Sequence, residues 1–129
     1  MEGRGNYKQN LGQLGEDLAC TYLHGIGHTI LERNWRNGHL EIDIISLDKD
    51  GIHFVEVKAR RKSIQAPPQE SVDYRKQARI TKASLAFLNS RNGLGYGNLE
   101  CSFDIIAITF EGEQAKVEWI PQAYIPIYL

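Results

Sequence analysis

The chain has 129 residues, a length that suits one domain with a sizeable core and is too short for two. Hydrophobic residues make up 42% and charged residues 24%, as in ordinary soluble proteins, and no apolar run is long enough to span a membrane. The net charge of −1 excludes a protein that coats nucleic acid through bulk charge, and the N-terminus lacks the apolar core of a signal peptide. We expect one cytoplasmic domain over residues 1–129, without membrane association, whose first residues (about 1–9) are mobile.

The first predicted element is an amphipathic helix. Apolar residues recur at helical spacing from about Asn10 to Leu23, and Gly25 then favours an end to the helix. Glu16 lies off the apolar stripe, beside small residues that would let this side of the helix approach a sheet. Glu16 is therefore a candidate third carboxylate of a site, and the alternative is a solvent-exposed helical glutamate.

Three strands are predicted to follow as an antiparallel meander. His28 to Trp35 forms the first strand, and Asn37-Gly38 is typical of a type I′ turn into the strand that starts at Leu40. Counting across that turn places Glu32 opposite Asp43.

The second and third strands alternate apolar with ionisable side chains, so Asp43, Glu56 and Lys58 share one face of their hairpin. A four-residue loop from Asp48 to Gly51 would put Asp43 opposite Glu56. A two-residue Asp50-Gly51 turn would put it opposite Lys58 instead. Both registers keep the three ionisable groups on one face.

This pattern points to a divalent metal. Opposed side chains on one face have Cβ atoms about 5 Å apart, and two carboxylates at that range repel unless a cation or a proton lies between them. Mg²⁺ takes carboxylate and backbone oxygens, and Lys58 could steer a water molecule or neutralise charge on a phosphate. The alternative is an exposed hairpin with ordinary surface charges. Asp43 and Glu56, however, lie amid Ile and Val, where a partly buried charge needs a partner.

The next segment is strongly basic. Residues 58–82 hold eight basic and two acidic residues, a net charge of +6, so the rest of the chain carries −7 of the total of −1. A phosphate backbone approaching the metal site would suit this charge, and the alternative is a solvated helix face. The candidate nucleic-acid contacts are Arg60, Arg61, Lys62, Arg75, Lys76, Arg79 and Lys82.

Secondary structure in the basic segment is predicted to be a loop and then a helix. Residues 60–72 lack a hydrophobic period and contain Pro67-Pro68, which predicts a mobile loop. Ser71 or Asp73 can cap a helix running to about Asn89. Lys76 heads its inward stripe, in line with Ile80, and should point at the carboxylates, whereas Arg75, Arg79 and Lys82 face outward.

Two more strands are predicted, Ser102 to Phe110 and Ala115 to Ile120, and the uncharged tail should pack on the core or on another subunit. The four histidines predict no metal site, because glycines separate His24 from His28 and the other two stand alone near turns. Cys20 and Cys101 predict buried thiols.

The order of these elements resembles the αβββαβ core of the PD-(D/E)xK nucleases, the restriction-endonuclease-like fold. More closely, the chain resembles the bacterial YraN family, described as endonuclease-like and similar to archaeal Holliday junction resolvases. The matching positions are Gly12 to Ala19 (GQLGEDLA), Asn34, Glu41-Ile42-Asp43, Phe54 to Lys58 (FVEVK), Lys76 and Phe103-Asp104. Leu40 stands in place of the family's usual Gly, and Ser102 in place of its usual Arg, whereas the acids are intact.

The resemblance implies an α/β fold with a mixed central sheet and flanking helices. It also implies that Glu16, Asp43 and Glu56 are the metal-binding acids and that Lys58 is the catalytic lysine. In the mechanism that we expect, Asp43, Glu56 and the Val57 carbonyl hold Mg²⁺ or Mn²⁺, and Glu16 supports a water molecule or a second ion. The resemblance assigns no clear role to Glu41 or Asp104.

The leading hypothesis is a metal-dependent endonuclease that hydrolyses DNA, branched or structured, in repair or recombination. A homodimer is expected if the substrate is a symmetric junction. The alternative is a non-catalytic nucleic-acid-binding adaptor on a nuclease fold, and a third interpretation is a structural protein that associates through its tail. The complete Asp…Glu-x-Lys set favours the enzyme.

Overall fold

The computed structural model describes residues 7–62 and 73–126, with side chains from residue 11 onward. Its elements follow the order α1 (Tyr7–Gly25), β1 (Thr29–Asn37), β2 (Leu40–Asp48), β3 (Gly51–Arg61), α2 (Tyr74–Leu88), a 3₁₀ turn η1 (Leu94–Tyr96), β4 (Cys101–Glu111) and β5 (Gln114–Ile120). This is the expected αβββαβ order with one further strand.

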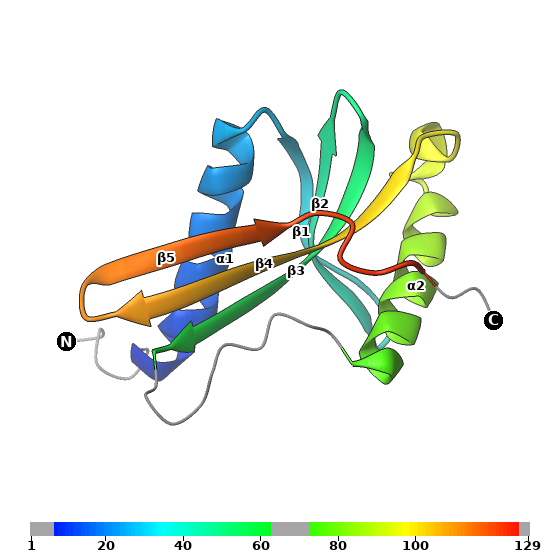
Figure 1. Cartoon of the computed structure of the whole chain (residues 1–129). Coiled ribbons are helices and arrows are strands. Elements are labelled where there is room, and N and C mark those ends of the chain that lie inside the picture. Colours follow the sequence, from blue (N-terminus) through cyan, green and yellow to red (C-terminus); the bar gives the residue numbers. More distant parts are fainter. Residues whose placement is uncertain (1–6, 63–72, 127–129) are drawn as a thin grey trace.

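The five strands form one mixed sheet in the order β1-β2-β3-β4-β5. Neighbouring strands are antiparallel except β3 and β4, which run parallel. A parallel pair cannot be joined by a tight turn, and here α2 lies in the connection between β3 and β4 (Figure 1). The structure therefore has the mixed α/β architecture that the sequence predicts.

Each helix covers one face of the sheet. Ala19 and Leu23 of α1 pack with Ile44, Val55 and Ile106. The neighbouring residues on the same strands lie instead in the core against α2, formed by Ile45, Phe54, Phe103, Ile105, Ile80, Ala83 and Phe87. Because successive side chains on a strand point to opposite faces, α1 and α2 lie on opposite sides of the sheet.

Helix α2 has the predicted boundaries, whereas α1 begins at Tyr7, inside the segment that was expected to be a mobile N-terminus, and continues to Gly25. Helix α2 begins after Asp73, whose carboxylate accepts a hydrogen bond from the Lys76 amide at 2.9 Å. In α1 the buried line is Gly15, Ala19 and Leu23, whereas Leu14 is half exposed. Small residues face the sheet because α1 approaches it closely.

Two local predictions were wrong. Asn37 pairs with Leu40, so the first turn consists of Gly38 and His39, and Gly38 takes the positive φ of 63° that such a turn needs. Glu32 therefore faces Ile45 rather than Asp43.

The second wrong prediction concerns the start of the expected loop. Strand β3 continues to Arg61, because its parallel ladder with β4 extends to Phe110. The loop predicted from residue 60 thus begins later, and residues 63–72, like residues 1–6, lie outside the described part of the chain. Both cysteines are free, and they are half-buried rather than buried.

Candidate active site

The register of the second hairpin sets the geometry of the two predicted acids. Asp48 pairs with Gly51, and the ladder continues to the pair Ile44 and Val55, where its pairing stops. Asp43 and Glu56 are the next residues on each strand, so they face each other just where β2 and β3 cease to pair. Of the two registers left open by the sequence, the structure has the one that opposes the two carboxylates.

The electrostatics of this pair are unusual. Glu56 is 9% exposed. Burial, the charge of Glu56 and a hydrogen bond from one carboxyl to the other raise the pKa of Asp43 to about 7. Without a metal, Asp43 therefore keeps its proton up to near neutral pH, because the neighbouring carboxylate disfavours a second negative charge. A divalent cation could take the place of that proton.

The backbone beside Glu56 adds a third oxygen to this corner. The amide N–H of Val57 donates to Asp43 Oδ2 at 2.9 Å, so this edge of Val57 faces β2. In an extended strand the N–H and C=O of one residue point to the same neighbouring strand. The Val57 carbonyl therefore faces the strand that carries Asp43. A metal ligand that acts together with Asp43 needs this direction.

A lysine from α2 closes the pocket around the carboxylates. Lys76 Nζ lies 3.1 Å from Glu56 Oε2, as the helical periodicity predicted. The pocket has a volume of about 250 Å³. Its lining consists of His39, Glu41, Asp43, Glu56, Lys76, Arg79 and Ile80. Glu41, which has no assigned role, thus lies on the wall of this pocket and also forms an ion pair with Arg36 at 3.0 Å.

Lys58 lies two residues after Glu56 on the same face of β3. Burial lowers the pKa of its ammonium group and the charge of Lys76 lowers it further, whereas Glu56 and Asp73 act in the opposite direction. The Lys58 ammonium group thus gives up its proton more readily than an ordinary lysine does, and it lies beside an acidic pair. Such a group can donate a hydrogen bond to a water molecule or to a phosphate oxygen.

The structure does not place Glu16 among the residues that line this pocket. Its Oε1 accepts a hydrogen bond from Asn34 Nδ2 at 2.9 Å and lies 3.6 Å from Arg33. Asn34 is in the left-handed region with φ of 53°, and its place between Arg33 and Trp35 in the ladder puts it across from Asp43. Glu16 is therefore held by two residues of β1, Asn34 and Arg33, and does not contact Asp43 directly in the described part of the chain.

The basic residues fall into two groups around the site. Arg60, Arg61 and Lys62 follow Lys58 at the end of β3, whereas Arg75, Lys76, Arg79 and Lys82 belong to α2. Arg79 lines the carboxylate pocket, so this outward-facing residue also borders the site. Lys62 lies 3.4 Å from Glu111, which partly neutralises its charge.

A second polar cluster was missed by the sequence analysis, which treated His53 and His28 as unrelated. His53 Nδ1 lies 2.7 Å from Asp104 Oδ2, and His53 Nε2 lies 2.9 Å from Asp48 Oδ1. Asp104 is fully buried. It also accepts hydrogen bonds from Ser102, Trp119 Nε1 and the Gln122 amide. Ser102, which stands where the family that this sequence resembles usually has an arginine, thus supplies a local partner to Asp104.

Fold and site together define a mixed α/β protein with a pair of opposed carboxylates at the end of a hairpin. Residues 15–108 match the model of the uncharacterised protein family UPF0102. The chain is 43% identical to a UPF0102 protein of Geobacter metallireducens, over 92% of this chain and 94% of the relative. It is 44% identical to one of Trichlorobacter lovleyi, over 95% and 94%. One from Bacteroides thetaiotaomicron is 35% identical, over 90% and 93%.

This protein therefore belongs to the UPF0102 family, which is YraN-like. These relatives carry the family name alone, so activity and substrate have to be argued from the site. Neither α1 nor α2, the helices in the described part of the chain, is long and apolar enough to cross a membrane.

Proposed function

We propose that this protein is a metal-dependent endonuclease that hydrolyses phosphodiester bonds in DNA, branched or structured DNA above all. The observation that carries the proposal is the pair of buried Glu56 and half-buried Asp43, opposed across the end of a ladder, with the pKa of Asp43 raised to about 7. An acidic pair of this kind is costly unless it binds a cation. Its surroundings of lysine and arginine suit a phosphate.

The donor set fits Mg²⁺ or Mn²⁺. Asp43, Glu56 and the Val57 carbonyl would hold the ion, since all three offer the hard oxygen ligands that such ions prefer. Glu16 would act at longer range, through water, because its carboxylate is held by Asn34 and Arg33. When bound, the ion supplies charge that stabilises the phosphate transition state and lowers the pKa of a coordinated water.

The protein side chains have separate roles. Lys58 would donate a hydrogen bond to the attacking water and so orient it in line with the bond that breaks. Water oxygen adds to phosphorus, the bond from phosphorus to the 3′ oxygen breaks, and that oxygen takes up a proton. The products are a 5′-phosphate and a 3′-hydroxyl. Lys76 and Arg79, on the wall of the pocket, would neutralise the phosphate charge.

One observation favours the adaptor as a second candidate. The Lys76 ammonium already sits 3.1 Å from Glu56, where it supplies positive charge to the acidic pair without any metal. A protein that binds DNA through this basic surface and never turns over could keep the pair in that state. The two candidates differ in whether the bound DNA is cut.

The test is cleavage of end-labelled four-way junction, flap, duplex and single-stranded DNA with Mg²⁺, Mn²⁺ or chelator. The endonuclease should cut one or more of the branched substrates only with metal, and leave 5′-phosphate ends. Asp43→Asn and Lys58→Ala should each lower the rate by about 100-fold or more while the protein stays folded.

Glu118→Gln and Lys116→Ala, which change exposed charges on β5, are the matched controls and should leave the rate unchanged. Wild-type activity in Asp43→Asn would overturn the site assignment. Tight DNA binding without cleavage of any substrate would overturn the enzyme and favour the adaptor.

A further inference from the structure

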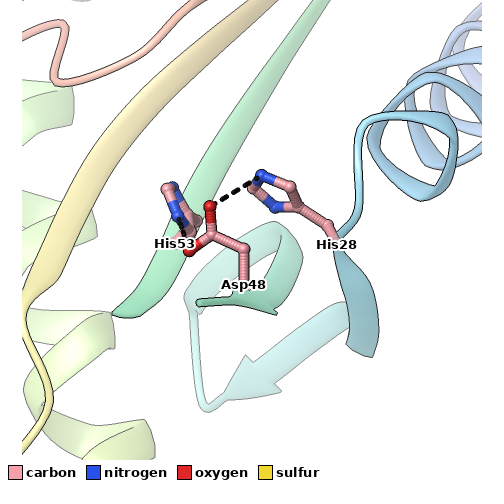
Figure 2. A group of neighbouring side chains, drawn as sticks. All are labelled: His28, Asp48 and His53. Atoms are coloured by element: carbon pink, nitrogen blue, oxygen red, sulfur yellow. Dashed lines mark hydrogen bonds and ion pairs between the residues drawn. The ribbon is translucent and has the colours of Figure 1, made fainter. Parts of the chain in front are cut away.

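A group of three buried or half-buried side chains lies away from the carboxylate pocket, at the turn end of the β2–β3 hairpin. His28 follows α1 and immediately precedes β1, Asp48 ends β2, and His53 lies near the start of β3. Figure 2 shows the Asp48 carboxylate between the two imidazole rings, with one oxygen toward each. His53 and Glu56 have opposite parity on β3, so this cluster and the acidic pair lie on opposite faces of the sheet.

Local backbone features hold two of the three residues, His28 and Asp48, in place. Gly27 adopts a φ of 101°, which ends the α1 segment and lets the His28 amide donate to the Leu23 carbonyl at 2.9 Å. Asp48 Oδ1 accepts hydrogen bonds from the amides of Asp50 and Gly51 at 3.0 and 3.1 Å, which fixes the turn. The positions of His28 and Asp48 are therefore fixed by hydrogen-bonded backbone.

Each of the two imidazole rings is oriented by a polar partner on its Nδ1 atom. His28 Nδ1 lies 2.9 Å from Ser46 Oγ, and His53 Nδ1 lies 2.7 Å from Asp104 Oδ2. Each ring therefore directs its Nε2 toward Asp48 (Figure 2). A carboxylate or hydroxyl on the far nitrogen of a histidine is the arrangement that orients histidine ligands in metal sites.

The distances between the inward-facing atoms suit a tetrahedral ion. His28 Nε2 lies 3.5 Å from Asp48 Oδ2, and His53 Nε2 lies 2.9 Å from Asp48 Oδ1. One atom from each of the three residues can be chosen so that all lie within 4.8 Å of one another. Two ligands at the usual bond lengths of tetrahedral zinc lie about 3.4 Å apart. The side chains thus need only small rotations to meet a common ion.

We propose that His28, Asp48 and His53 form a binding site for one Zn²⁺ ion. Two imidazoles and one carboxylate are ligands that zinc accepts, whereas Mg²⁺ prefers oxygen alone. Asp48 and His53 also line a pocket of about 500 Å³, so the fourth coordination position opens toward a space that water or a small anionic ligand can enter. The ion would join the ends of β1, β2 and β3, which are the strands that carry the acidic pair farther along.

This site is independent of the proposed endonuclease activity. Asp48 lies five residues from Asp43 along β2, which is roughly 16 Å of strand. His53 lies three residues from Glu56 along β3, which is roughly 10 Å. Loss of zinc binding and loss of cleavage can therefore be observed separately. Asp43→Asn should leave zinc binding unchanged, and a wild-type protein that cuts no DNA could still bind zinc.

The first experiment is titration of metal-free, tag-free protein with ZnCl₂, followed by calorimetry and by competition with a chromophoric chelator. We expect one Zn²⁺ per chain, with Mg²⁺ unable to displace it. His53→Asn and His28→Asn should each weaken zinc binding by about 100-fold or more, and Ser46→Ala, which removes the partner of His28 Nδ1, by roughly 10-fold. His24→Asn, at an exposed histidine near the same end of α1, is the matched control and should bind as wild type does.

A second measurement uses the wild-type protein and so does not depend on the folding of variants. In ¹H–¹⁵N spectra of the histidine side chains, zinc should shift the Nε2 signals of His28 and His53 and leave those of His24 and His39 in place. Co²⁺ in place of zinc should give the visible absorption of a four-coordinate ion. The proposal is overturned if zinc does not bind at one ion per chain, or if it binds without moving these two Nε2 signals. The cluster would then be a buried proton-sharing network.

Discussion

Protonation of the Asp43 carboxyl makes the stability of the folded protein depend on pH. In the folded protein without metal this carboxyl keeps its proton up to about pH 7, whereas the ordinary pKa of an aspartate is 3.8. The folded state thus binds more protons than the unfolded chain between these values. The stability contributed by this proton is fully present below about pH 3.8 and is lost as the pH rises through about 7. Above that range, two closely spaced negative charges with little access to water repel each other.

Asp43→Asn should remove this pH dependence, since the amide keeps the hydrogen bonds and cannot ionise. In chelator, we expect the variant to gain stability relative to wild type as the pH rises from about 5 to 8, by an amount on the order of a few kcal/mol. Urea denaturation across that range measures it, and Mg²⁺ should narrow the gap by stabilising only the wild type.

Glu118→Gln should show no such trend. A variant of Asp43 that is less stable than wild type at pH 8 without metal would indicate that the carboxylate has a structural role.

Lys76 would compete with the proposed metal ion for the Glu56 carboxylate. Its ammonium group lies 3.1 Å from Glu56 and is half exposed, so the pair contributes about 0.5–1 kcal/mol. Lys76→Met keeps the apolar stem and removes the charge, and should lower the Mg²⁺ concentration needed for half-maximal cleavage by about two- to five-fold. It should also slow turnover more than it weakens DNA binding, because the lost charge neutralises the phosphate in the transition state.

Cleavage rates at several Mg²⁺ concentrations, together with DNA affinity in Ca²⁺, separate these effects. Lys82→Met, at an exposed position on the same helix, is the control. If Lys76→Met weakens DNA binding alone, Lys76 is a simple phosphate contact.

At the scale of elements, the contact between α1 and β3 requires a glycine at position 15. A Cβ added at Gly15 would lie 2.6 Å from the Cβ of Ala59, shorter than real contacts between such atoms. The glycine is thus needed for packing rather than for backbone freedom. It precedes Glu16, so the same contact sets where that carboxylate lies.

Gly15→Ala should destabilise the protein by about 1–3 kcal/mol, because α1 or β3 must shift to admit the methyl group. Gly12→Ala is its matched control on the same helix, where an added Cβ meets nothing within 4 Å. There the higher helix propensity of alanine should stabilise the protein by about 0.5–1 kcal/mol. Urea denaturation measures both changes, and equal effects of the two substitutions would contradict close packing at Gly15.

At the scale of the molecule, charge is separated even though the total is near neutral. Eight of the 15 lysine and arginine residues lie at the end of β3 and along α2, and the excess of acidic residues lies elsewhere in the chain. Such a distribution can direct a DNA backbone toward one region while the rest of the surface repels it.

If these residues contact phosphates, DNA affinity should fall with salt concentration with a log-log slope of about −0.9 per phosphate neutralised on duplex DNA. Arg75→Ala combined with Arg79→Ala should make that slope shallower by about one unit per lost contact, with little dependence on base sequence. Arg91→Ala, at an exposed position beyond the far end of α2, should leave the slope unchanged. Fluorescence anisotropy at several salt concentrations measures it. A slope that stays the same in the double variant would mean that α2 is only a solvated charged face.

Sequence by itself determined the features that repeat along the chain. Alternation of apolar and ionisable residues predicted β2 and β3 and placed Asp43, Glu56 and Lys58 on one face, because side chains on a strand alternate. Helical periodicity predicted that Lys76 points toward the two carboxylates, and its ion pair with Glu56 agrees with that direction. The order of elements and the family also followed from local pattern.

Only the tertiary structure decided which distant residues meet. The hairpin register, the turn at Gly38, the partners of Glu16 and the parallel pairing of β3 with β4 depend on packing between elements. The parallel pairing places Val55 beside Asp104 and so brings Asp104 to His53, 51 residues away, which no periodicity within one segment reveals. His28 reaches Asp48 because α1 ends at a glycine and β1 then runs antiparallel to β2. Local sequence sets the direction of a side chain along its own element, whereas the contact it makes depends on which elements pack side by side.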